Sequence, residues 1–228
     1  MKNIMQVKLS TCLAAAIGFI LLLNGCTKNA DYETAMCALV DISGTYADQK
    51  KNVVKLIKAG LLPGMVPGDS LFLITIGSNS YDEKNLIHKV TLDYRPSEVN
   101  NQKLAFAKAL DKFAEGTERS SHTDISGAMM LCGDHLKDTQ AGTQLMFIFS
   151  DMEQDLKPGT QRKFEKREFA DMHIAAMNVI MLENDNSNPQ VYRDRLRKWE
   201  ERVKGAGAKQ WEVILEPAKI LEFIEDAK

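Results

Sequence analysis

A carboxylate and two hydroxyl groups lie two residues apart in the segment Asp41-Ile42-Ser43-Gly44-Thr45, which directly follows the apolar run 36–40. Alternate residues of an extended segment point to the same side, so Asp41, Ser43 and Thr45 can converge on one point. Oxygen atoms are the ligands that hard cations such as Mg²⁺ take in proteins, together with several waters. The same pattern also forms helix N-caps and turns, which is its commoner use after a strand. The segment alone leaves both interpretations open.

A second carboxylate, Asp151, follows another strongly apolar run, residues 145–150. In an open α/β sheet, ligands bind outside the carboxyl ends of the strands, near the point where the strand order reverses. If the runs before Asp41 and Asp151 are both buried parallel strands, the two acids reach the same edge. Together with Ser43, Thr45 and a further hydroxyl, they would form a cup for a divalent metal ion.

Strands and helices that alternate along the chain are expected to position these side chains. The run 70–77 is almost continuously apolar, as in a strand covered on both faces, whereas the alternating segment 88–94 is typical of an edge strand. Strand patterns occur at 34–42, 70–77, 88–94, 145–150, 177–182 and 211–215. Helix patterns occur at 46–60, 102–113 (with Leu104 facing inward), 124–136, 189–205 and 217–227. This alternation, without an internal repeat, predicts one doubly wound α/β domain with a mainly parallel central sheet flanked by helices.

The first 26 residues have the features of a targeting signal. Lys2 and Lys8 are the only charges before the apolar run 12–23, which is too short for a membrane-spanning helix. The run ends in Leu23-Asn24-Gly25-Cys26, which resembles the lipobox of bacterial lipoproteins, whose cysteine becomes the lipidated first residue of the mature chain. An ordinary cleaved signal peptide or a membrane-anchor helix is the alternative.

The lipobox resemblance divides the chain into a signal peptide over 1–25, a lipidated Cys26 with a polar tether over 26–33, and one domain over 34–228. Several acyl chains on one cysteine would anchor the protein firmly to a membrane. Thr27 stands where many Gram-negative lipoproteins of the inner membrane carry aspartate. We therefore expect a bacterial cell-envelope protein, held at the outer membrane and facing the periplasm if the source is Gram-negative.

Charge and cysteine content argue against several other classes. The expected mature chain carries 27 Lys and Arg against 31 Asp and Glu, because Lys2 and Lys8 leave with the signal, so its net charge of −4 is not that of a nucleic-acid-binding protein. The basic run 193–204 is interleaved with acids and predicts a solvated helix face. Cys37 and Cys132 are expected to be buried thiols, although an oxidising envelope permits a disulfide. The four histidines lack the spacing of zinc ligands.

The chain resembles a von Willebrand factor A domain along residues 34–228. The metal-ion-dependent adhesion site of that family begins with Asp-x-Ser-x-Ser, which here is Asp41-x-Ser43-x-Thr45. Its next ligand is a loop threonine before a helix, here Thr123 in Thr123-Asp124, and its last is the aspartate of a Thr/Ser-Asp-Gly turn. Here that turn is Ser150-Asp151-Met152, so methionine stands where glycine is usual.

The resemblance implies a Mg²⁺ (or Mn²⁺) site for protein–protein binding. Ser43 and Thr45 would bind the metal directly, Thr123 directly or through water, and Asp41 and Asp151 through water. Neutral hydroxyls next to the metal leave it electrophilic, so that an open position can accept an Asp or Glu carboxylate from a partner protein. The expected outcome is binding and not catalysis. Glu153 and Asp155 are expected to be solvated loop acids, and Asp124 is expected to interact with the N-terminal dipole of its helix and not to be a ligand.

Two other functions remain open. Phosphatases of the haloacid dehalogenase type carry Asp-x-Asp-Gly-Thr after the first strand, and the second acid transfers a proton. Ser43 stands at that position and is poorly suited to the task. The other alternative is a structural envelope lipoprotein whose metal site is vestigial.

Overall fold

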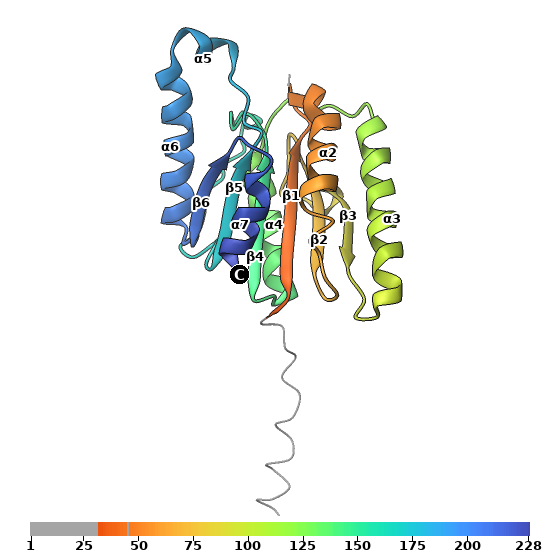
Figure 1. Ribbon diagram of the computed structural model, residues 1–228. Helices are drawn as coiled ribbons and strands as arrows, with labels where there is room; N and C mark the ends of the chain where they lie inside the picture. Colours follow the sequence, from red (N-terminus) through yellow and green to blue (C-terminus); the bar gives the residue numbers. More distant parts are fainter. Residues whose placement is uncertain (1–31, 45) are drawn as a thin grey trace, which may run out of the picture. The chain divides into compact units, whose positions relative to one another are not determined.

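The computed structural model describes residues 32–44 and 46–228, which build a six-stranded sheet between two layers of helices (Figure 1). The strand order is β3-β2-β1-β4-β5-β6, and only the β2–β3 pair is antiparallel. The strands are β1 (Thr34–Asp41), β2 (Ser70–Ile76), β3 (Leu86–Thr91), β4 (Thr143–Phe149), β5 (Met172–Met177) and β6 (Gln210–Ile214). This arrangement confirms the predicted doubly wound α/β fold, with β3 at an edge.

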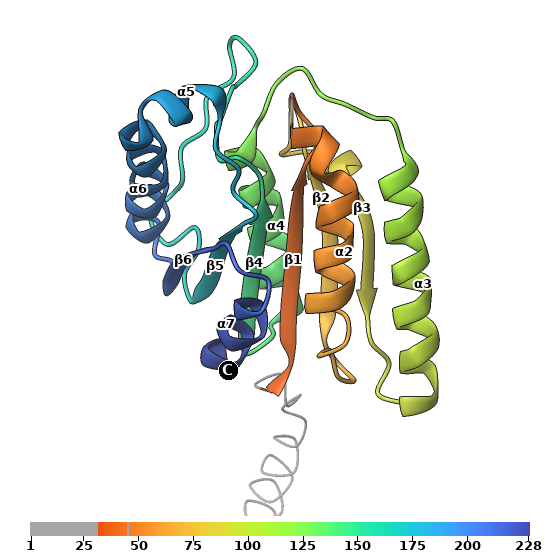
Figure 2. The same cartoon turned by 45° about the horizontal axis from the view of Figure 1, so that its top comes forward.

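The helices cover both faces of the sheet. In Figures 1 and 2, α2 (Lys50–Gly60) and α7 (Lys219–Ala227) lie on one side of the strands and α4 (Ile125–Thr139) lies on the other. The core residues show that α3 (Pro96–Glu115) shares the face of α2, and that α6 (Pro189–Gly205) shares the face of α4. The remaining helical segments are short: η2 (Tyr46–Gln49), η3 (Glu83–Asn85) and α5 (Glu183–Ser187).

The central strand β1 shows why the sequence reads as a continuous apolar run. Its residues Met36, Ala38 and Val40 join the core under α2, α3 and α7, whereas Ala35, Cys37 and Leu39 join the core under α4 and α6. A strand buried on both faces has no polar side. Cys37 and Cys132 are both buried free thiols in this second core.

The order of the strands places a reversal point next to β1. The chain moves from β1 to β2 on one side and returns to β4 on the other, so β1 has parallel neighbours on both sides. Loops that leave β1 and β4 at their carboxyl ends therefore diverge around this point, which is where α/β sheets bind ligands. Asp41 ends β1, and Asp151 lies two residues after β4.

Two sequence predictions about elements are wrong. The strand predicted at 177–182 is β5 (Met172–Met177), and Asn178, with a φ of 50°, ends it. The segment 177–182 is richer in β-branched residues, which favour strands. Pairing with the neighbouring strand sets the bounds of β5 instead, since Met172 aligns with Gln144 near the start of β4. Helix α3 begins at Pro96 and not at residue 102, and Leu104 is 56% exposed. The buried side of that helix consists instead of Val99, Phe106, Leu110 and Phe113.

The expected signal peptide, the lipidated Cys26 and most of the tether lie outside the described residues, as does Thr45. Within the part of the chain that the structure describes, no helix has both the length and the apolarity needed to cross a membrane.

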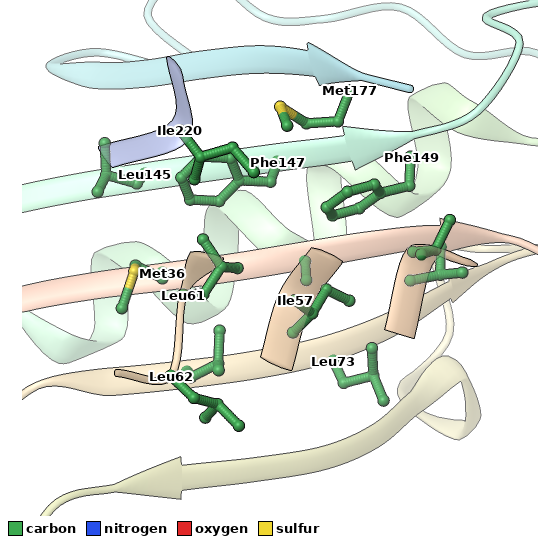
Figure 3. Close-up of a cluster of buried hydrophobic side chains, with 14 of the residues drawn as sticks. Met36, Ile57, Leu61, Leu62, Leu73, Leu145, Phe147, Phe149, Met177 and Ile220 are labelled. Carbon is green, nitrogen blue, oxygen red and sulfur yellow. The ribbon is translucent and has the colours of Figure 1, made fainter. Parts of the chain in front are cut away.

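Phe147, in the middle of β4, is completely buried and lies beside Ile220 of α7 (Figure 3). The centre of its ring is 5.8 Å from that of Phe223, in an edge-on arrangement. Phe147→Ala is expected to lower the free energy of unfolding by about 3–5 kcal/mol, because it leaves a cavity between the sheet and α7. Urea unfolding followed by circular dichroism measures the loss. Leu104→Ala removes an exposed side chain and should change the free energy by less than about 0.5 kcal/mol. Equal losses in the two variants would contradict this packing.

Candidate metal centre

The carboxylate of Asp41 lies completely buried at the end of β1 and organises the loop that follows. Its Oδ1 accepts hydrogen bonds from the backbone N–H of Ser43 at 2.8 Å and from the Ser43 hydroxyl at 2.5 Å. Gly44 then turns the chain with a φ of 46°, a conformation that glycine adopts without strain. The first two side chains of the motif therefore lie together, whereas Thr45 is outside the described residues.

A second loop brings Thr123 to the same place. The hydroxyl oxygens of Ser43 and Thr123 are 2.5 Å apart, although the residues are 80 positions apart in the chain. The backbone N–H of Ser120 donates to the carbonyl of Ile42 at 2.9 Å. Thr123 also exchanges two backbone hydrogen bonds with Asp155, at 2.8 and 3.0 Å. The Thr123 loop is thus held on one side by the loop after β1 and on the other by the loop after β4.

The loop after β4 supplies a second acid and a further hydroxyl. Ser150 donates its hydroxyl proton to Oδ2 of Asp41 at 2.6 Å. Asp151 is 9% exposed, and its Oδ1 accepts the backbone N–H of Glu153 at 2.8 Å. Four of the five predicted ligands, Asp41, Ser43, Thr123 and Asp151, therefore come from three loops that meet at one edge of the sheet.

Met152 adopts the backbone conformation of the glycine that the resemblance leads one to expect. Its φ is 63°, in the left-handed region, and its side chain is completely buried in the core under α4 and α6. Such a conformation costs a non-glycine residue roughly 1–2 kcal/mol. Burial of the side chain offsets this cost, and the indole Nε1 of Trp199 donates to the Met152 carbonyl at 2.8 Å. The departure from the family pattern therefore leaves the turn in place.

Burial makes the centre unfavourable for negative charge. It raises the pKa of Asp41 to about 6, even though the hydrogen bonds from Ser150 and Ser43 lower it, and the neighbouring Asp151 raises it further. Burial also raises the pKa of Asp151, against the lowering effects of its backbone hydrogen bond and of Arg195. Two acids that lose hydration in this way gain from a nearby cation.

The donor atoms fit a hard cation. Because the Ser43 hydroxyl donates its only proton to Asp41, the Thr123 hydroxyl must donate to Ser43, so that no described residue donates to the lone pairs of Thr123. Oxygens that share an edge of a Mg²⁺ octahedron lie about 3 Å apart, so the pair would have to separate by only about half an ångström. Along residues 32–44 and 46–228, no three His, Cys, Asp or Glu side chains come together as metal ligands, so hydroxyls would have to complete this centre.

Asp124, next to Thr123, stands at the N-terminus of helix α4 as predicted, where it is the N-cap, and it also holds a side chain that the sequence did not indicate. Its Oδ1 accepts the N–H of Gly127 at 2.8 Å. Arg162, from the long connection 150–171, forms an ion pair with this fully buried carboxylate at 2.8 Å. The N–H and hydroxyl of Ser126 donate to the side chain of Gln154, in the same connection, at 2.8 and 2.6 Å. The connection is therefore fastened to the start of α4, beside the candidate ligand.

Solved structures of low sequence identity share this fold, whereas no family model and no curated protein matches the chain. Von Willebrand factor type A from Catenulispora acidiphila has a TM-score of 0.50 and 12% identity over 86% of this chain and 42% of its own. An aerotolerance-related membrane protein from Bacteroides fragilis has a TM-score of 0.50 and 15% identity over 85% of this chain and 97% of its own. A mutant PilB minor pilin from Streptococcus sanguinis has a TM-score of 0.50 and 10% identity over 86% of this chain and 60% of its own. The chain has the fold of a von Willebrand factor A domain.

The raised pKa of Asp41 fixes the sign of a pH effect on the metal-free protein. The folded state releases this proton near pH 6 and the unfolded state near pH 4, so Asp41 destabilises the fold increasingly as the pH rises between these values. Relative to wild type, Asp41→Asn is expected to gain stability between pH 4 and pH 7.5, by about 3 kcal/mol at most. Urea unfolding in EDTA at the two pH values measures this change. Parallel pH profiles for wild type and Asp41→Asn would contradict the assignment.

Proposed function

We propose that the chain is a membrane-anchored lipoprotein whose von Willebrand factor A fold binds a partner protein through Mg²⁺ or Mn²⁺. In this proposal, Ser43 and Thr45 bind the ion directly, and Thr123 binds it directly or through water. Asp41 and Asp151 act through water and orient the hydroxyls. When bound, the ion would supply a positive charge that attracts an Asp or Glu carboxylate of the partner.

The observation that carries the proposal is the meeting of the Ser43 and Thr123 hydroxyls, 2.5 Å apart, beside two buried acids. Hydrogen bonds fix the geometry of Asp41 and Ser43, so these groups need little rearrangement to surround a cation. The acids carry charge that burial disfavours, and a divalent ion would offset it.

The same proposal places the domain at the cell envelope. Lipid on Cys26 would hold it to a membrane, and the tether over 27–33 would reach at most about 25 Å when extended. Thr27 favours the outer membrane, facing the periplasm, in a Gram-negative source. The domain would then meet partners close to the membrane surface.

The phosphatase alternative needs a proton-transferring acid two residues after Asp41, and Ser43 occupies that position. The Ser43 hydroxyl is already committed as a donor to Asp41 and lacks the acidity for the task. Metal-dependent turnover of p-nitrophenyl phosphate by the purified chain would identify this alternative. A structural lipoprotein with a vestigial site would bind neither Mg²⁺ nor Mn²⁺.

Asp151→Ala is expected to weaken Mg²⁺ and Mn²⁺ binding by about 10- to 100-fold, because a group that orients the ligands and balances the charge is lost. Folding should be largely retained, since the variant removes a carboxylate that burial disfavours. Titration calorimetry measures the affinity, and circular dichroism checks the fold. Asp111→Ala is the matched control, because it removes an exposed carboxylate on α3, outside the three loops of the centre. Equal affinities in wild type and Asp151→Ala would count against the metal centre.

A partner from envelope extracts is expected to be retained on the immobilised full chain in Mg²⁺ and released by EDTA. EDTA removes the metal ion, so the carboxylate of the partner protein loses the group to which it binds. Mass spectrometry of the released fraction identifies the partner, and Asp151→Ala should retain much less of it. Retention that survives EDTA would show that binding does not depend on a metal.

A further inference from the structure

A cavity of about 400 Å³ lies between the loop after β4 and helix α6. Met152 and Glu153, which directly follow Asp151, form one wall. Three cationic side chains of α6 line the other wall, namely Arg195, Lys198 and Arg202. A cavity of this size accommodates a small polar group with its apolar stem.

Arg195 corrects the prediction that residues 193–204 form a solvated helix face. It is 8% exposed and forms an ion pair with the fully buried Asp185, at 2.5 and 3.2 Å. Glu153 binds the same guanidinium at 3.2 Å, from the rim of the cavity. The Nε–H of Arg195 is buried and finds no hydrogen-bond partner among the described residues, which costs free energy.

Arg202 lines the same cavity and forms no ion pair with the described residues. Its guanidinium stacks 4.3 Å from the ring of Trp199 and 4.9 Å from that of Phe164, and one N–H donates to the Ser126 hydroxyl at 2.8 Å. Within the described chain, neither Arg202 nor Lys198 has a carboxylate within 4.0 Å. Burial lowers the pKa of Arg202, as expected for a cation that is not paired.

The acids of the cavity do not supply the missing charge. Glu153 is engaged with Arg195, and Asp194 accepts hydrogen bonds from Gln190 and Arg197. Lys198 and Arg202 therefore line the cavity without an ion pair to residues 32–44 and 46–228, and Lys198 has only a longer-range interaction with Asp194. A carboxylate fits the planar fork of a guanidinium, and a desolvated cation binds it more strongly than an exposed one.

We propose that this cavity, which we call the Arg202 pocket, binds a second acidic side chain of the partner protein whose first acidic side chain meets the metal ion. The inference rests on the proposed function. The pocket and the metal centre share one loop, since Asp151 belongs to the centre and Met152 and Glu153 to the pocket. A partner with two suitably spaced acidic residues would engage both at once, and it would be preferred over proteins that present a single carboxylate.

The test compares capped glycine peptides that carry one glutamate with a series that carries two, separated by one to six residues. In Mg²⁺, the best two-glutamate peptide is expected to bind the full chain at least about tenfold more tightly than the one-glutamate peptide. This affinity ratio should fall toward one in Lys198→Gln and in Arg202→Gln. Arg193→Gln removes an exposed positive charge from the same helix and should retain the ratio. Lys198 is exposed, so its variant keeps the test valid if Arg202→Gln destabilises the fold.

A second measurement separates the pocket from the metal centre. In EDTA, glutarate is titrated against the full chain carrying Trp211→Phe, so that Trp199 reports alone on the pocket through its fluorescence. A saturable change that Arg202→Gln abolishes is expected. If peptide binding proves independent of Mg²⁺ but this change is seen, the proposed metal function fails and the pocket stands. If glutarate binds but no two-glutamate peptide gains affinity, the occupant is a free dicarboxylate, and the inference about the partner is overturned. No saturable change in the Trp211→Phe chain that retains Arg202 overturns the pocket itself.

Discussion

The burial of the Asp41 carboxylate is the constraint on which the structure at the carboxyl ends of the strands depends. A carboxylate without access to water must be satisfied by donors, and its neighbours in the sheet are apolar strands. The donors come from Ser43 in its own loop and from Ser150 after β4, and Thr123 continues the chain of hydroxyls. Hydrogen bonds that start at one buried carboxyl group therefore link three loops that are distant in the chain. The pKa of about 6 shows that the donors compensate for this burial only in part.

Much of this arrangement could be predicted from local sequence. Continuous apolar runs predicted β1, β2 and β4. Ligands bind where the strand order of such a sheet reverses, and this rule predicted that Asp41 and Asp151 lie at the same edge. Thr123 could be assigned only through the family motif, because nothing local distinguishes it from other loop threonines. The error at β5 arose because propensity favoured 177–182, whereas pairing with β4 selected Met172–Met177.

Ion pairs with buried acids were beyond prediction. Arg162 and Arg195 look like ordinary surface cations in a charged sequence, but each is paired with a fully buried acid, Asp124 and Asp185. Such ion pairs leave no periodic signal, since they depend on how two segments pass each other in the fold. The same reason hid the Arg202 pocket, whose walls come from segments that are separate in sequence and adjacent only in the fold.

The contacts of residues 150–171 with helix α4 determine how this long connection responds to hydrolysis of a peptide bond. Gln154 and Arg162 tie it to α4, and Phe164 packs against the buried Phe169 at 4.7 Å, so it is divided into short spans. A short span loses little entropy on closure, and each half keeps its own anchor. Hydrolysis of a single peptide bond between Gln154 and Arg162 would leave both new chain ends attached to the same helix. The two ends of a cleaved connection would then stay bound to the domain, which would remain folded around α4.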